Sequence, residues 1–134
     1  MWDVRCILFS QSIFMNAEQM RQRTKDFAIK TAQFILMLDY TIVNKTYSNQ
    51  LIRCSSSVAA NYRAVRRAKS KADFINKLKI VEEELDESLL FLELLLEFNK
   101  ARHDTIQLLM KEAEELLRII VASINSARNR TSNI

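Results

Sequence analysis

The chain has 134 residues, of which 49% are hydrophobic and 27% charged, and its formal net charge is +4. This length suits one domain with a buried core, and the apolar content excludes an intrinsically disordered chain. The sequence contains no glycine and no proline. Tight β-turns ordinarily need glycine, so we expect an all-α fold.

Two further features of composition limit the class of protein. No apolar run approaches the ~20 residues of a membrane span, so we expect no membrane association. The two cysteines, Cys6 and Cys54, show neither metal-ligand spacing nor a disulfide framework. We therefore expect reduced thiols and a cytoplasmic location.

The first half of the chain is predicted to form two helices. Residues 1–15 do not share the pattern that follows, so we expect an N-terminal extension outside the fold. Asn16, with Gln19 three residues later, is a capping box that starts a helix over residues 17–38. Residues 39–48 are β-branched and polar and are predicted to form the longest internal connection.

The second predicted helix covers residues 49–68 and carries an unusual run of small side chains. They are Ser55, Ser56, Ser57, Ala59, Ala60 and Ala64. Small side chains let a neighbouring helix approach closely, so we expect this helix to be the most central one. A large residue at position 60 should then overpack the bundle.

The third predicted helix covers residues 71–99 and begins after Ser70, which has Asp73 in the first turn. Eight of the ten residues from 89 to 98 are apolar, more than one seam of a bundle can bury. This surplus predicts a homo-oligomer. The candidate interface residues are Leu89, Leu90, Phe91, Leu94 and Phe98.

A short polar turn over residues 100–104 precedes the fourth predicted helix, which Asp104 caps and which ends at about Ser126. Residues 128–134 are expected to form a polar, frayed tail. Helices joined by mostly short links predict an antiparallel up-down-up-down four-helix bundle over residues 16–127.

Nothing in the chain forms an active site. The acidic run over residues 82–87 suggests a carboxylate-bridged metal pair, but that site needs Glu-x-x-His motifs, and the only histidine, His103, lies in a turn. We expect instead a solvated face whose acids partly pair with basic residues of the second helix. The serines at 55–57 lack the partners of a hydrolase. We therefore expect no enzymatic activity, no metal and no cofactor.

Basic residues gather at one end of the predicted bundle. In an up-down-up-down arrangement the start of the first helix, the end of the second, the start of the third and the end of the fourth share one end. That end collects ten Lys and Arg residues against three acids. The candidate nucleic-acid-binding residues are Arg63, Arg66, Arg67, Lys69, Lys71, Arg128 and Arg130.

Three segments of the central region also carry a resemblance. Residues 57–63 read SVAANYR, residues 68–78 read AKSKADFINKL, and residues 83–88 read EELDES. Together they resemble the signature of the bacterial four-helix bundle proteins, also described as 23S rRNA intervening-sequence proteins. The accessory variability determinant of diversity-generating retroelements is a relative. One departure is Ala64, where many members carry glutamate.

The resemblance implies a small cytoplasmic bundle that assembles into a ring-like homopentamer without enzymatic activity. It also implies association with RNA, or with a reverse transcriptase and its template, through basic surfaces. Two functions stay open on the sequence. One is a scaffold associated with RNA or DNA through its basic end, and the other is a protein-protein assembly module with no nucleic-acid binding. A small-molecule carrier that uses the bundle interior is a third, weaker possibility.

Overall fold

The computed structural model describes residues 16–131, so the predicted N-terminal extension and the last three residues of the predicted tail lie outside the described part of the chain. Within it the secondary structure is helical, with no strand. The elements are α2 (Ala17–Ile35), α3 (Ile42–Val65), α4 (Lys71–Phe98), the 3-10 helix η1 (Lys100–Arg102) and α5 (His103–Thr131).

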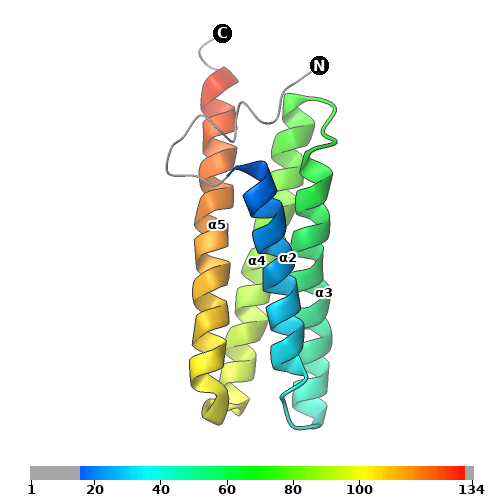
Figure 1. The fold of residues 1–134 in the computed structure, drawn as a ribbon, viewed down its shortest axis with the longest axis vertical. Helices are drawn as coiled ribbons and strands as arrows, with labels where there is room; N and C mark the ends of the chain where they lie inside the picture. The colour runs from blue at the N-terminus through cyan, green and yellow to red at the C-terminus, as the bar shows by residue number, and fades with distance from the viewer. Residues whose placement is uncertain (1–15, 132–134) are drawn as a thin grey trace.

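The four α-helices form the predicted antiparallel up-down-up-down bundle (Figure 1). Of the four pairs of neighbouring α-helices, α3 and α4 pack most extensively and α2 and α5 least. Because α2 has 19 residues and α4 and α5 have 28 and 29, the longer helices extend past α2 at the end where α3 joins α4. We call this the basic end, and we call the other, where α2 meets α3 and α4 meets α5, the far end.

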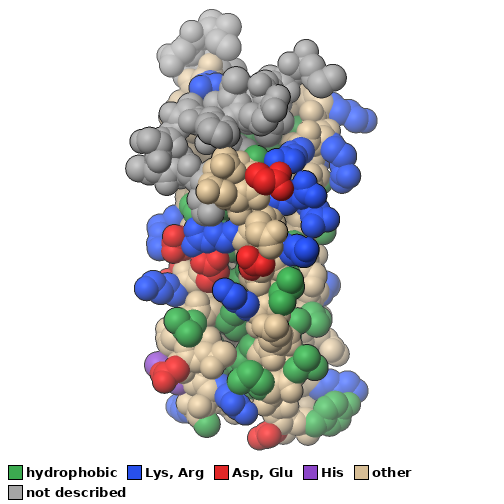
Figure 2. Space-filling view, viewed as in Figure 1, with side chains coloured by type: hydrophobic (Ala, Val, Ile, Leu, Met, Phe, Trp, Pro, Cys, Tyr) green, Lys and Arg blue, Asp and Glu red, His purple; other side chains and the backbone are tan. Residues whose placement is uncertain are grey.

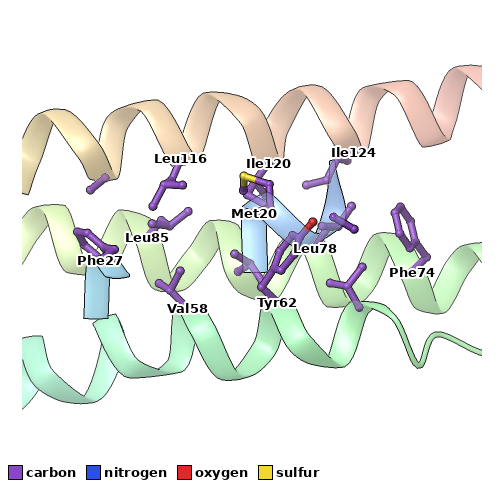
Figure 3. Close-up of a cluster of buried hydrophobic side chains, with 14 of the residues drawn as sticks. Met20, Phe27, Val58, Tyr62, Phe74, Leu78, Leu85, Leu116, Ile120 and Ile124 are labelled. Carbon is purple, nitrogen blue, oxygen red and sulfur yellow. The ribbon is translucent and has the colours of Figure 1, made fainter. Parts of the chain in front are cut away.

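The core is a seam of side chains from all four helices. The larger of its two clusters lies nearer the basic end, and Figure 3 shows its members interleaved. Its largest side chains are Met20, Phe27, Tyr62, Phe74, Leu78, Leu85 and Leu116. A smaller cluster around Phe34, Leu51, Leu92, Leu95 and Ile106 fills the far half. Tyr62, which follows Leu51 and Val58 at helical spacing, is a core residue.

Side-chain caps replace glycine at the helix ends. The predicted capping box is confirmed, because Asn16 accepts a hydrogen bond from the backbone N–H of Gln19 at 2.8 Å and Gln19 bonds back to Asn16. Thr41 caps α3 and Ser70 caps α4 in the same way. No described residue has a positive φ, so the turns need no left-handed backbone.

The predicted connection over residues 39–48 is wrong, because α3 begins at Ile42. Thr41 accepts from the backbone N–H of Asn44 at 3.0 Å and starts the helix. Asn44 and Asn99 then exchange two side-chain hydrogen bonds, of 3.1 and 2.7 Å, which tie the start of α3 to the end of α4. This tertiary contact outweighs the low helix preference of the β-branched residues.

The small side chains of α3 do not form its packing face as predicted. Ser55 is buried, but Ser56 and Ala60 are exposed. The buried stripe consists instead of Leu51, Cys54, Val58, Tyr62 and Val65. Since the small residues lie mostly beside this stripe, α3 packs through large side chains and shares the centre of the bundle with α4.

The end of the chain also differs from the prediction. The 3-10 helix η1 runs directly into α5 at His103, so Asp104 lies in the first turn and does not precede the helix as its cap. The helix continues to Thr131. Arg128 and Arg130, predicted to lie in the tail, therefore belong to its last turn.

These positions give a matched pair of substitutions. We expect Ser55→Leu to lower the free energy of unfolding by about 1–3 kcal/mol, because Ser55 has no exposed surface and the added carbons overpack the seam. Ala60→Leu, on the exposed side of the same helix, should change it by less than about 0.5 kcal/mol. Urea denaturation monitored by circular dichroism measures both. Equal effects of the two substitutions would contradict this packing.

Candidate nucleic-acid interface

The turn between α3 and α4 holds most of the predicted basic residues. Backbone bonds from Arg67 N–H to the Ala64 carbonyl, at 3.0 Å, and from Ala68 N–H to the Val65 carbonyl, at 3.1 Å, close the end of α3. Ser70 then accepts from Asp73 N–H at 3.1 Å and starts α4. The chain thus reverses over a few residues, of which Ala68 packs against the core and Arg66, Arg67, Lys69 and Ser70 are exposed.

Asp73 lies in this turn, but its carboxylate already accepts hydrogen bonds from other groups. Its carboxylate accepts from the Lys77 ammonium at 2.7 Å and from the Lys69 backbone N–H at 2.9 Å. These hydrogen bonds, that of Lys77 first, lower the pKa of Asp73. Within residues 16–131, the ammonium groups of Lys69 and Lys71 make no ion pair.

Glu18 is the acid of α2 that reaches the basic residues of α3. Arg66 bonds its carboxylate at 2.8 Å, and Arg21 lies 4.0 Å from it. Arg63 and Arg67 are exposed and make no ion pair with any described residue. Figure 2 shows the resulting group of Lys and Arg side chains beside the start of α2. We call Arg63, Arg66, Arg67, Lys69 and Lys71 the basic turn.

Two other predicted residues lie at the same end but on α5. Arg128 and Arg130 are exposed in its last turn. Two residues apart on a helix, they project in nearly opposite directions. They add positive charge to the basic end, but they do not both face the same side of α5.

Arg23 does not contribute to the excess of positive charge at the basic end, although its position early in α2 places it near that end. It pairs with Glu112 at 2.7 Å and with Glu115 at 2.9 Å, and so joins α2 to α5. The hydrogen bond to Glu112, aided by Glu115, raises the pKa of Arg23. The sequence does not reveal this interhelical pair, because Arg23 and Glu112 are 89 residues apart in the chain.

Part of the acidic face of α4 is paired with α3, as predicted. Arg53 bonds Glu87 and lies 3.5 Å from Glu84, a distance that makes an ion pair but leaves the buried Glu84 Oε2 without a hydrogen bond. Burial, followed by the nearby charge of Glu87, raises the pKa of Glu84. In the described part of the chain, no group of three His, Cys, Asp or Glu could hold a metal ion.

The candidate interface residues of α4 differ in burial and fall into three sets. Leu89 packs in the core, whereas Leu90 and Phe98 are 49% and 59% exposed. Phe91 and Leu94 are half-buried. Tyr47 of α3, which no pattern in the sequence singles out, contacts the rings of Phe91 and Phe98 with centroid distances of 6.2 Å. None of the helices over residues 16–131 has the length and apolarity needed to cross a bilayer.

Comparisons with known proteins agree with this architecture. A family model described as 23S rRNA-intervening sequence protein matches residues 17–122. A solved structure from Bacteroides thetaiotaomicron, a protein of unknown function from the S23 ribosomal protein family, aligns with a TM-score of 0.71 and 26% identity. The alignment covers 81% of this chain and 97% of that one. No curated protein matches the chain.

The raised pKa of Glu84 predicts a pH-dependent stability. In the folded state its carboxyl is harder to ionise than in the unfolded chain, so the folded protein loses stability as pH rises through the folded pKa. We expect Glu84→Gln to become more stable relative to wild type between pH ~4 and pH ~7. Urea denaturation across that range measures the difference. Exposed Glu83→Gln controls for the lost charge, and a wild-type advantage that grows with pH would contradict the assignment.

Proposed function

The chain belongs to the 23S rRNA-intervening sequence protein family, and we propose that it is a non-enzymatic, oligomeric scaffold that binds the phosphate backbone of RNA or DNA. The observation that carries the proposal is the basic turn. Among the described residues, Glu18 of α2 is the one acid that pairs with the five cations of the basic turn, while Asp73, the acid of the turn itself, is held by Lys77. The remaining positive charge is free to meet phosphates.

The chemistry of the basic turn favours backbone contact over base recognition. Arg and Lys side chains bind phosphate oxygens and release condensed counterions, so affinity should fall steeply with salt. Base stacking needs exposed aromatic rings, but Tyr62 and Phe74, the aromatic residues nearest the turn in the described chain, are buried. We therefore expect binding with little sequence preference.

Assembly is the second part of the proposal. The exposed apolar side chains of α4, Leu90 and Phe98, with Leu94 between them, leave a surface that a second subunit would cover. A cyclic homo-oligomer would place every basic end on one face and so multiply the phosphate contacts. A ring of five subunits rests on the family resemblance alone. The buried free thiol of Cys54 fits the reducing environment of the cytoplasm.

The second candidate is a protein-protein assembly module that binds no nucleic acid. The same apolar surface of α4 favours it, because such a surface can receive a different protein as well as a copy of the chain. A reverse transcriptase is the partner class that the family resemblance suggests. The two candidates differ in whether the basic turn binds phosphate.

Removing charge from the basic turn tests the first candidate. We expect Arg66→Ala, Arg67→Ala and Lys69→Ala together to weaken binding of RNA and DNA about equally. The slope of log affinity against log salt should fall by about 0.7–0.9 for each phosphate that the variant no longer neutralises. The measurement is a fluorescence titration across a salt series.

The matched control removes three exposed lysines elsewhere, Lys45, Lys79 and Lys100, and so lowers net charge by the same amount. This control variant should keep most of the affinity. If wild type binds neither nucleic acid at low salt, or both triple variants bind alike, the basic turn is not the binding site.

Charge placed on α4 tests the assembly. We expect wild type to be oligomeric at micromolar concentration, and Leu90→Asp with Phe98→Asp to give a folded monomer, because both side chains are exposed in the single chain. Light scattering gives the mass and circular dichroism the helix content. A monomeric wild type, or an unchanged mass for the variant, would refute this interface.

A further inference from the structure

A groove opens between α2 and α5 in the half of the bundle near the far end. One boundary is the Arg23 pair with Glu112 and Glu115, and the other is a 3.1 Å hydrogen bond from the Arg102 guanidinium to the Met37 carbonyl. Between these boundaries α2, the residues that follow it and α5 border an open cavity of about 240 Å³. Its lining includes Phe34, Met37, Leu108 and Leu109.

The lining of this groove is apolar and open to solvent. Leu108 is 70% exposed and Met37 is 42% exposed, so that together they form an exposed apolar patch. Figure 2 shows hydrophobic side chains spread over this half of the molecule, with few acids among them. An apolar groove of this kind fits the side chains of a partner helix.

Among the described residues, the one charged side chain that lines the groove is positive. It belongs to Lys30, and exposed Lys111 lies one turn along α5 from Leu108. Of the acids beside the lining residues of α5, Glu112 is paired with Arg23, and exposed Asp104 adjoins Thr105 at the open end. A partner helix with acidic residues beside its apolar ones would therefore match the groove in charge.

The exposed face of α4 has this chemistry. Leu90, Leu94 and Phe98 are spaced by four residues and form an apolar ridge, with exposed Glu93 and Glu97 between them in the chain. At 1.5 Å per residue the ridge is about 12 Å long, whereas the lining residues of α5, from Thr105 to Leu109, span about 6 Å. The ridge is therefore long enough to span the groove, and it matches the groove in apolarity and charge.

The ridge and the groove lie on different sides of the bundle. α4 packs mainly against α3 and α5, while the groove lies between α2 and α5. One molecule therefore cannot fill its own groove with its own ridge. Pairing two ridges would set Glu93 and Glu97 against the same acids of the other copy, which like-charge repulsion opposes.

We propose that the ridge of one copy occupies the α2–α5 groove of the next copy, in a head-to-tail contact. This inference rests on the homo-oligomer of the proposed function and specifies which surfaces meet. Each subunit offers one ridge and one groove, and repetition of such a contact gives a closed ring when the rotation between subunits closes. The partner that the groove fits is therefore a second copy of this chain.

A mixing experiment distinguishes a head-to-tail contact from a symmetric one. The ridge variant carries Leu90→Asp and Phe98→Asp, and the groove variant carries Met37→Asp and Leu108→Asp. Each variant alone should be a monomer. An equimolar mixture should form a dimer of one copy of each, because the groove variant keeps an intact ridge and the ridge variant an intact groove.

Light scattering and native mass spectrometry with one variant isotopically labelled measure the outcome. Ile52→Asp with Ile80→Asp, at exposed apolar positions outside both surfaces, is the matched control and should keep the wild-type mass. A wild-type oligomer whose groove variant still assembles, or a mixture that contains only monomers, overturns the head-to-tail contact and leaves the oligomer intact. A monomeric wild type overturns both proposals.

Charge reversal gives a second test if the aspartate variants lose helix content. Glu93→Lys with Glu97→Lys should raise the dissociation constant about tenfold or more, and so should Lys30→Glu with Lys111→Glu. All four side chains are exposed, so the fold should tolerate the changes. The quadruple variant should recover most of the affinity. Additive losses in the quadruple variant would overturn the pairing.

Discussion

The pairing of α3 with α4 is fixed by polar contacts at both of its ends, and the remaining helices pack against that pair. At the basic end the Ser70 cap and the bonds of Asp73 hold the turn. At the far end Asn44 and Asn99 exchange two hydrogen bonds. A chain without glycine or proline must turn with ordinary backbone conformations, and side-chain caps make this possible.

The way in which the helices are joined also determines which charged and apolar side chains are exposed. In the tight turn between α3 and α4 the carboxylate of Asp73 accepts a hydrogen bond from Lys77. The cations of the basic turn therefore do not have Asp73 as an ion-pair partner. Where α2 and α5 separate, apolar side chains such as Leu108 stay exposed. The molecule is therefore basic at one end and apolar toward the other, which suits a subunit that joins copies of itself and holds a polyanion.

Features set by neighbouring residues could be predicted from the sequence, and those set by distant contacts could not. The Asn16 and Ser70 caps follow local spacing, and the structure has them. The start of α3 could not be predicted, because the Asn44–Asn99 contact joins residues 55 positions apart. The prediction that Ala60 lies on the packing face was also wrong. A run of small side chains lets a neighbouring helix approach only where those side chains face the core, and composition does not show which of them do.

The claim on which the functional account depends is that the assembled protein binds a phosphate backbone. The most direct measurement is the ultraviolet absorbance of full-length protein purified at low salt, before and after treatment with ribonuclease or high salt. The account predicts excess absorbance at the nucleic-acid maximum that either treatment removes and that the basic-turn variant lacks. Protein that arrives free of nucleic acid at low salt, and takes up none when RNA or DNA is added, would contradict it.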